Sequence, residues 1–236
     1  MDAGKLAQIK GEGELRFAKA GLTLVGCYAV LLILSMVPFG VFTGMGRILI
    51  HMPPVVNGIF RITFQCLISM FLIGPLTVGM KKGMLNLKES EDITGCLFYA
   101  FDSTRYMKIV RGLVLYTLIG VVMSVLNFID EILPIKLFYV PVIFMSFAIA
   151  FIQVFMLCFV EYLVAEDHDI SPVDACTNSI NLMNGHKKDL WNFILLYLKE
   201  ILICIVTCGL GLFYYVPKYQ CGFTCFYEHL KENSDT

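Results

Sequence analysis

Long apolar runs are the feature that most constrains what this 236-residue chain can fold into. An α-helix needs about 20 apolar residues to cross the hydrocarbon core of a bilayer. Because lipid offers no hydrogen-bond partner to an open backbone, a chain that crosses it has to do so as a helix. Runs of spanning length occupy residues 21–40, 62–80, 112–129, 138–160 and 190–230.

The last run, residues 190–230, is too long for one helix and contains Gly209 and Gly211. Splitting it at these glycines predicts a hairpin of two helices over 190–207 and 212–230. Charged residues lower the hydrophobicity of both halves, so the sequence leaves open whether this stretch crosses the membrane once or twice. We predict an all-α fold, a polytopic membrane helix bundle with about six transmembrane helices.

The composition also favours lipid as the surroundings of the folded chain. Hydrophobic residues make up 58% of it, and only 16% of its residues are charged, against about 25% in an ordinary soluble domain. The length suits a single integral membrane domain over residues 1–236. The net charge of -1 gives no basis for a nucleic-acid partner. Nine cysteines, most of them inside apolar runs, are expected to pack as small side chains rather than as disulfides.

The positions of Lys and Arg predict on which side of the membrane each connecting segment lies. If the amino terminus is inside, most of these residues fall in cytoplasmic segments. The outer segments then hold only Arg47, Arg61 and Lys136. We therefore expect a multi-pass protein of the plasma (cytoplasmic) membrane with both its N- and C-termini in the cytoplasm.

A short amphipathic helix is predicted between the fourth and fifth runs. Ser171 is suited to cap it, Pro172 fits the first helical position, and Asp174 completes a capping-box pattern. Gly185 supplies a stop. We interpret this helix as cytoplasmic and as a candidate docking surface for a membrane-protein partner, formed by the apolar face of Val173, Cys176, Ile180 and Met183.

Lys199, Glu200 and Lys218 are the charged residues least compatible with the predicted hairpin. The first two would lie about half-way along a helix that begins near Leu190, at roughly 1.5 Å per residue. Each charge at that depth costs about 2.5–3.5 kcal/mol on insertion scales. Glu200 and Lys218 are equally far from a turn near Gly209, so we predict an ion pair between them. The pair is either a polar pathway or ligand site inside the membrane, or a contact that fixes the register of the hairpin.

Other polar residues receive structural interpretations. Arg61 is expected to reach to the membrane interface, and Gln153 to make an interhelical hydrogen bond. The acidic stretch from Glu161 to Asp174 lacks the ligand spacing of zinc and calcium sites and is interpreted as a solvated loop. No motif of a nucleophilic, phosphate-binding or metal-dependent enzyme occurs. We predict no catalytic, cofactor-binding or metal-binding residues and no cofactor.

Several local patterns carry a family resemblance. They are Gly74-Pro-Leu-Thr-Val-Gly79, Ser179-Ile-Asn-Leu-Met-Asn-Gly-His-Lys187, Tyr215-Val-Pro-Lys-Tyr219 and Cys225-Phe-Tyr-Glu-His-Leu230. In that order they resemble a bacterial integral-membrane family known as domain of unknown function 975. The resemblance implies a multi-helix bacterial membrane protein and no established activity, so it transfers no site residues. The chain departs from the family where Lys199-Glu200 replaces an apolar stretch with Gly-Trp.

These observations leave three classes of function. The first is a non-enzymatic accessory component of the cell envelope that binds a membrane-protein partner or forms an oligomer, with membrane lipids around it. The second is a small transporter, or a protein that handles lipids or peptides, working through Lys199, Glu200 and Lys218. An enzyme is the least supported, because no constellation of catalytic residues is present.

Overall fold

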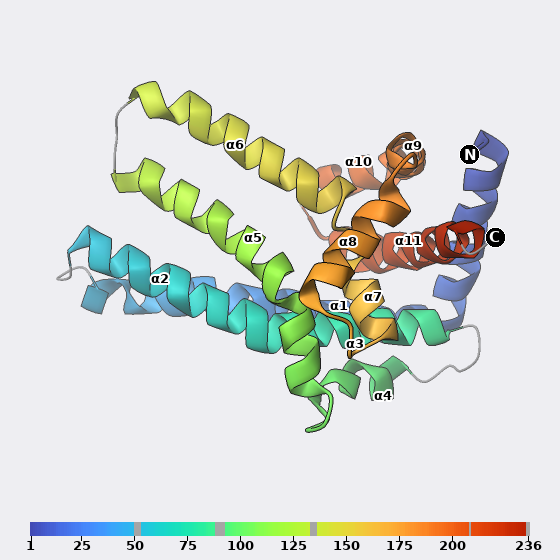
Figure 1. The fold of residues 1–236 in the computed structure, drawn as a ribbon, viewed down its shortest axis with the longest axis horizontal. Coiled ribbons are helices and arrows are strands. Elements are labelled where there is room, and N and C mark those ends of the chain that lie inside the picture. The colour runs from blue at the N-terminus through green and yellow to red at the C-terminus, as the bar shows by residue number, and fades with distance from the viewer. Residues whose placement is uncertain (50–52, 88–92, 133–135, 208, 235–236) are drawn as a thin grey trace.

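The computed structural model describes residues 1–49, 53–87, 93–132, 136–207 and 209–234. These residues form helices and the turns between them, and no strand occurs among them. The predicted all-α class is therefore confirmed. Figure 1 shows that both termini lie at one end of the molecule, and that α2, α5 and α6 extend together away from that end.

The long helices supply segments that can cross a membrane. They are α1 (Ala3–Leu49), α2 (Pro54–Ile68), α3 (Gly74–Asn86), α5 (Tyr106–Ile132) and α6 (Lys136–Phe155). A single π-helical turn, η1 (Ser69–Ile73), joins α2 to α3. Four segments of the described chain are long and apolar enough to span: Ala3–Met36, Val55–Asn86, Tyr106–Leu126 and Ile143–Glu166. Only 17–28% of the residues in their apolar windows are buried, which suits surfaces that meet lipid.

These four segments overlap the first four predicted runs, but the predicted total of six is not reached. Residues 190–207 do not form one helix, because the chain breaks at Leu196 and Tyr197 between α9 (Lys187–Leu195) and α10 (Leu198–Val206). Each has nine residues, or about 14 Å of helix, against a hydrocarbon core of about 30 Å. The predicted fifth crossing is therefore replaced by two short helices.

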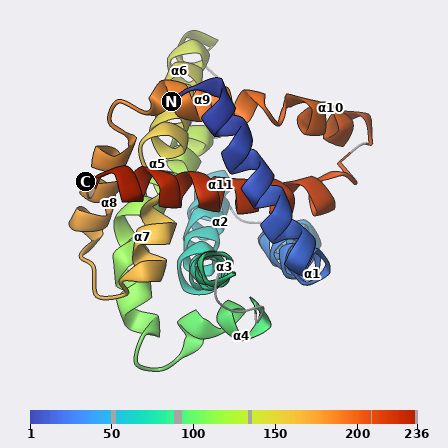
Figure 2. The same ribbon diagram turned by 90° about the vertical axis from the view of Figure 1, so that its right-hand side faces the viewer.

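The last helix, α11 (Leu212–Ser234), covers the predicted sixth run but packs against other helices of the chain. Its polar residues Lys218, Gln220 and Glu228 all bind partners on α1 or α3. Figure 2 shows α11 running across the end of the bundle, with the first part of α1 crossing it. A helix held by polar contacts at the end of the bundle differs from the membrane hairpin that the sequence predicts.

We call the assembly at this end the helical cap, defined as residues 3–20, 159–197 and 215–234. It contains the first part of α1, most of α11, and the short helices α7 (Val160–Glu166), α8 (Pro172–Met183) and α9. Two further short elements, α4 (Ile93–Leu97) and η2 (Tyr99–Phe101), lie against α3. The largest fully buried side chains of the chain are mostly in the cap.

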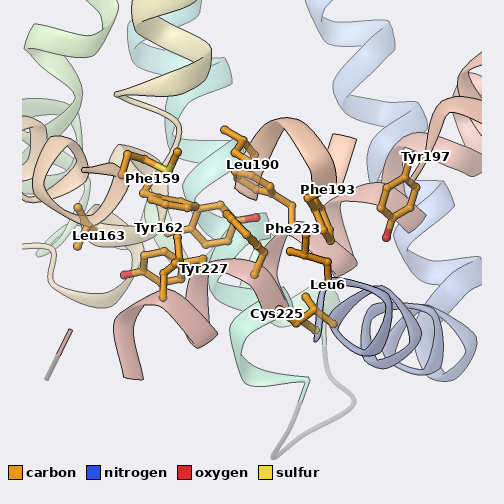
Figure 3. Packing of buried hydrophobic residues seen from close by; sticks show 14 residues of the cluster. Leu6, Phe159, Tyr162, Leu163, Leu190, Phe193, Tyr197, Phe223, Cys225 and Tyr227 are labelled. Atoms are coloured by element: carbon orange, nitrogen blue, oxygen red, sulfur yellow. The ribbon is translucent and has the colours of Figure 1, made fainter. Parts of the chain in front are cut away.

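Aromatic rings form the centre of the helical cap, as Figure 3 shows. Phe159 stacks on Phe223 with ring centroids 5.3 Å apart, and Tyr162 stacks on Tyr227 at 4.9 Å. Leu6 of α1 is buried in the same cluster. Aromatic pairs in these geometries contribute beyond the area that they bury. The cluster therefore joins α1, α7 and α11 into one folded unit.

Two glycines allow α1 and α11 to cross in close contact. A Cβ atom at Gly13 would lie 2.3 Å from the Cα of Gly222, so no larger residue fits at Gly13 without moving a backbone. Ion pairs stand on both sides of this crossing: Glu14 with Lys218 at 3.0 Å, and Arg16 with Glu228 at 2.5 Å. Small residues thus set the distance between the helices, and the charges fix their register.

The predicted start of the amphipathic helix is confirmed. The Ser171 hydroxyl oxygen accepts a hydrogen bond from the Asp174 backbone amide at 3.1 Å, and Pro172 occupies the first helical position of α8. The helix ends at Met183, and Gly185 has a φ of +84°, a conformation that glycine adopts at little cost. Local chemistry in the sequence therefore decides where α8 begins and ends.

The fourth apolar run is broken between α6 and α7, at residues 156–159, and α8 stabilises the break. The hydroxyl of Ser179 donates to the Met156 carbonyl at 2.8 Å and accepts from the Phe159 amide at 3.2 Å. Ser179 is fully buried. One side chain therefore binds two backbone groups at the break in the helix.

Replacing Ser179 by alanine is expected to destabilise the fold by about 1–3 kcal/mol, because a buried amide loses its acceptor. Thermal unfolding of the purified protein, followed by circular dichroism, measures this loss. Thr177→Ala is the matched control, since Thr177 is exposed on the same helix and surface substitutions change stability by about 0.5 kcal/mol or less. Equal melting temperatures for the two variants would mean that Ser179 does not hold the break.

Candidate functional site

A polar cavity of 220 Å³ lies between the membrane-length helices. Helices α2, α3, α5, α6 and α7 all contribute to its wall. Its polar lining consists of Gln65, Ser69, Thr77, Tyr116, Thr117, Ser124, Gln153 and Glu161. Polar side chains in membrane-spanning segments are costly, so a cluster of this kind inside a bundle indicates a functional site.

The π-helical turn that forms part of the wall follows from the local sequence. Pro75 has no amide hydrogen, so the Phe71 carbonyl loses its usual helical donor. The hydroxyl of Tyr106 on α5 donates to that carbonyl instead, at 2.7 Å. Single π-helical turns of this kind are frequent at functional sites. Here the turn carries Ser69 into the wall of the cavity and ends at Ile73, directly before Gly74 of α3.

Helix α5 contributes a polar stripe to an otherwise apolar surface. Tyr116, Gly120 and Ser124 recur at four-residue intervals and therefore share one face of the helix. Gly120 leaves room opposite Gln153 of α6, whose Nε2 atom lies 3.8 Å from the position of an added Cβ. The Gln153 side chain, interpreted from sequence as an interhelical hydrogen bond, lines the cavity.

Among the described residues that line the cavity, Glu161 is the one acidic side chain. It lies in the first turn of α7, directly after the break that Ser179 stabilises. The Thr77 hydroxyl lies 3.3 Å from its Oε1 atom and 2.8 Å from the Gly74 carbonyl oxygen. The sequence interpretation assigned Glu161 to a solvated acidic loop, and the structure corrects this by placing it against the membrane-length helices.

Lys81 lies one turn beyond Thr77 on α3 and is buried. Its Nζ atom donates to Oε1 of Gln220 on α11 and lies 3.4 Å from the Tyr162 hydroxyl. The charge of Glu161 acts on this amine. Polar groups therefore continue from the cavity, through Glu161 and Lys81, to α11 in the helical cap.

The groups around the cavity are suited to bind a small cation. Glu161 supplies negative charge, and the hydroxyl and amide oxygens of the wall are neutral hydrogen-bond acceptors. Lys81 balances Glu161 electrostatically, but its hydrogen bonds go to Gln220 and Tyr162. A cation in the cavity would thus meet the carboxylate of Glu161, because the amine of Lys81 makes its hydrogen bonds to other residues.

The charged residues predicted to lie half-way across the membrane are placed at the edge of the helical cap. Glu200 binds Lys10 of α1 at 2.9 Å and lies 3.9 Å from Lys218. Lys218 binds Glu14 at 3.0 Å, and Lys199 is exposed. Glu200 lies in the first turn of a nine-residue helix and not half-way along a helix that begins near Leu190.

Lys10 is the partner of Glu200 that the sequence interpretation missed. Its Nζ atom also donates to the Leu196 carbonyl at 2.7 Å, where the chain breaks between α9 and α10. Burial alone would raise the pKa of Glu200, but the hydrogen bond from Lys10 and the charge of Lys218 outweigh it, so its pKa lies below the usual value. Glu200 is therefore a carboxylate at neutral pH.

The four residues of the predicted docking surface do not share one exposed face. Met183 is fully buried and packs in the core of the cap, and Cys176 is half-buried. Val173 and Ile180 remain exposed, by 61% and 37% of their surface. The physical reason is that α8 packs against α5 and α7, which takes part of its apolar stripe into the fold.

The acidic loop brings three oxygen or nitrogen ligand atoms close together. One such atom each from Asp167, His168 and Asp169 lies within 4.8 Å of the others. Asp169 binds Lys108 at 2.7 Å, and this hydrogen bond holds the pKa of its carboxyl below the usual value. Both aspartates are exposed, so the loop forms an ion-paired surface.

The cysteines that the structure describes are not joined in disulfides; Cys208 lies outside the described residues. Cys221 and Cys225 follow each other by one turn on α11, and both are buried. Burial raises the pKa of Cys221 to about 12, so its side chain stays a thiol at neutral pH. A thiol without thiolate character is a poor nucleophile and metal ligand.

Residues 130–234 match the model of a family described as "Protein of unknown function (DUF975)". This part of the chain resembles that family. The match confirms the resemblance predicted from the segments that begin at Ser179, Tyr215 and Cys225, whereas the segment at Gly74 lies outside it. No curated protein and no solved structure matches the chain.

The DUF975-like part contains only one side of the polar cavity. It supplies Gln153 and Glu161, while Gln65, Thr77 and Tyr116 precede it in the chain. It also contains α10 and α11 with their charged residues. The family description names no activity, so the function has to be inferred from the geometry of the site.

Proposed function

We propose that this chain is a non-enzymatic, multi-pass membrane protein that binds a small ammonium-type cation in its polar cavity and moves it across the membrane. The observation that supports this function is the carboxylate of Glu161 at a polar cavity inside membrane-length helices. An ionisable group in such a segment is by default a candidate for an ion pathway.

The chemistry of the cavity defines the class of ligand. A volume of 220 Å³ is below the roughly 300–1,000 Å³ of sites for drug-sized ligands, so the ligand is small. One carboxylate surrounded by hydroxyl and amide oxygens favours a cation that donates several hydrogen bonds. Methylammonium has this chemistry and serves as the probe.

The direction of the bundle in the membrane is part of the same proposal. Both termini lie at the helical cap (Figure 1), as an even number of crossings requires. Lys and Arg are concentrated in the segments at that end, which by the positive-inside rule is the cytoplasmic side of a plasma membrane. The path from Glu161 to Lys81 and Gln220 then leads toward the cytoplasm.

Uptake of radiolabelled methylammonium into proteoliposomes tests the proposal. The wild-type protein is expected to give saturable uptake. Glu161→Gln is expected to lower it by about tenfold or more, because the ligand loses a charge-assisted hydrogen bond.

Glu166→Gln is the matched control for this experiment. Glu166 lies on the same helix α7 but outside the cavity, where it binds Lys231 and Tyr227, and its variant should transport like the wild type. Wild-type uptake no faster than in empty liposomes would overturn the proposal, and so would full uptake by Glu161→Gln.

An accessory, partner-binding role is the second candidate. Val173 and Ile180 support it, because they remain exposed on α8 outside the membrane-length segments. They lie two helical turns apart and so share one face. The uptake experiment separates the two functions, because a protein that only binds a partner should show no methylammonium uptake that depends on Glu161.

A further inference from the structure

A second cavity, of 430 Å³, lies between α10 and α11 and differs from the polar cavity in its chemistry. Its wall is almost entirely apolar and includes Ile194, Ile201, Cys204, Leu212 and Val216. The volume falls within the roughly 300–1,000 Å³ of ordinary ligand sites. The shape and lining suit an apolar chain rather than a polar solute.

One charged residue, Glu200, lines this apolar cavity. Its Oε1 atom binds Lys10, but its Oε2 atom is buried and has no hydrogen-bond partner within the described residues. A buried carboxylate oxygen without a donor is costly. The cavity therefore offers an apolar space with one unsatisfied, negatively charged acceptor at its edge.

The outer surface of the α10–α11 hairpin is apolar on its open side, which suits contact with lipid. Val206 and Leu210 are exposed by 82% and 75%, and Leu202 and Phe213 are also exposed. Figure 1 shows α10 near the end of α6 that faces the helical cap, and Figure 2 shows α10 at the periphery of the molecule. A short apolar element at the end of a membrane bundle is stable when it lies in the membrane interface.

The charges near Glu200 decide which lipid head group fits. Lys10 and Lys218 balance Glu14 and Glu200, so the group as a whole is neutral. A net anionic head would add uncompensated charge, and a choline head has no hydrogen to donate. A zwitterionic head with a primary ammonium donates to Glu200 and leaves the balance unchanged.

We propose that the cavity between α10 and α11 binds an acyl chain of an ethanolamine phospholipid, whose ammonium group donates a hydrogen bond to Glu200. The bound lipid fixes the hairpin to the helical cap through the same carboxylate that Lys10 holds. This site is separate from the cation cavity and shares none of its lining residues.

Native mass spectrometry of the full chain in detergent, with equimolar dioleoyl phosphatidylethanolamine, phosphatidylcholine and phosphatidylglycerol, tests this site. The wild-type protein is expected to retain one ethanolamine lipid with a preference of about tenfold over the choline lipid. Glu200→Gln should abolish the preference. Equal retention of the two lipids by the wild type, or a preference for phosphatidylglycerol, would overturn the proposal.

Two tryptophan substitutions on α10 test the cavity itself without touching the bond between Lys10 and Glu200. Ile201→Trp fills the cavity and should prevent retention of the lipid. Val206→Trp is the control, because Val206 is exposed on the same helix and does not line the cavity. If Glu200→Gln fails to fold, the two tryptophan variants still test the site. Equal lipid retention by Ile201→Trp and Val206→Trp would contradict it.

Discussion

Replacing Gly13 by alanine is expected to lower the stability of the protein by about 3 kcal/mol, at the upper end of the usual cost of overpacking. The added methyl group would lie 2.3 Å from the Cα of Gly222 and 2.5 Å from its backbone nitrogen. No side chain can rotate away, so α1 and α11 have to separate. Thermal unfolding should show a decrease in melting temperature of about 6–12 °C.

Gly11→Ala is the matched control on the same helix. No atom outside the helix lies within 4 Å of the Cβ position at Gly11. The substitution should therefore be neutral or stabilise by about 0.5–1 kcal/mol, as alanine does in a helix. If Gly13→Ala melts at the same temperature as Gly11→Ala, the close crossing of α1 and α11 is not present in the folded protein.

Replacing the partner glycine, Gly222, by alanine is also expected to lower the stability, but a second substitution should restore part of it. A Cβ at Gly222 would lie 2.2 Å from the Tyr197 hydroxyl and 3.3 Å from the nearest ring atom of Phe193. Tyr197→Phe removes the hydroxyl and should restore part of the stability lost in Gly222→Ala. It should not rescue Gly13→Ala, because that clash is with backbone.

Replacing Lys81 by methionine is expected to raise the affinity of the polar cavity for methylammonium by about tenfold or more. The protonated amine of Lys81 attracts Glu161 and repels any cation that enters the cavity. Methionine keeps a similar length in the buried site but carries no charge. Binding of labelled methylammonium to the purified protein in nanodiscs measures the change.

Lys82→Met removes the same charge from the next residue of α3 and is the control. The Lys82 Nζ atom lies over the Tyr99 ring, 5.8 Å from its centroid, and Lys82 does not line the cavity. Its loss should leave the affinity unchanged. A decrease in affinity for Lys81→Met would show that Lys81 holds the ligand site together instead of competing with the ligand.

The apolar runs predicted the membrane-length helices well because burial in lipid depends on local composition alone. The start of α8 could likewise be predicted, since Ser171 and Asp174 form a local capping pair. The fold of the last part of the chain, from residue 190 onward, could not be predicted in the same way. In α10 and α11, Glu200 and Lys218 are stabilised by Lys10 and Glu14, which lie about two hundred residues earlier in the sequence, and no local pattern links residues so far apart.

The polar cavity could be predicted in part from the spacing of polar residues along the helices, although no single residue indicates it. Tyr116, Gly120 and Ser124 form a stripe along an apolar helix, and Gln65 and Ser69 do the same on the neighbouring span. Glu161 follows the fourth apolar run directly, but the acidic residues after it favoured a loop. The break at residues 156–159, which orients Glu161, depends on Ser179, and no local pattern shows that contact.

Equilibrium binding of radiolabelled methylammonium to the wild-type protein and to Glu161→Gln, both in nanodiscs, tests whether the polar cavity is a cation site. Saturable binding by the wild type, weakened by about tenfold or more in Glu161→Gln, is the predicted result. Absence of saturable binding by the folded wild-type protein, or equal affinity of the two proteins, would contradict the assignment of the cavity as a cation site.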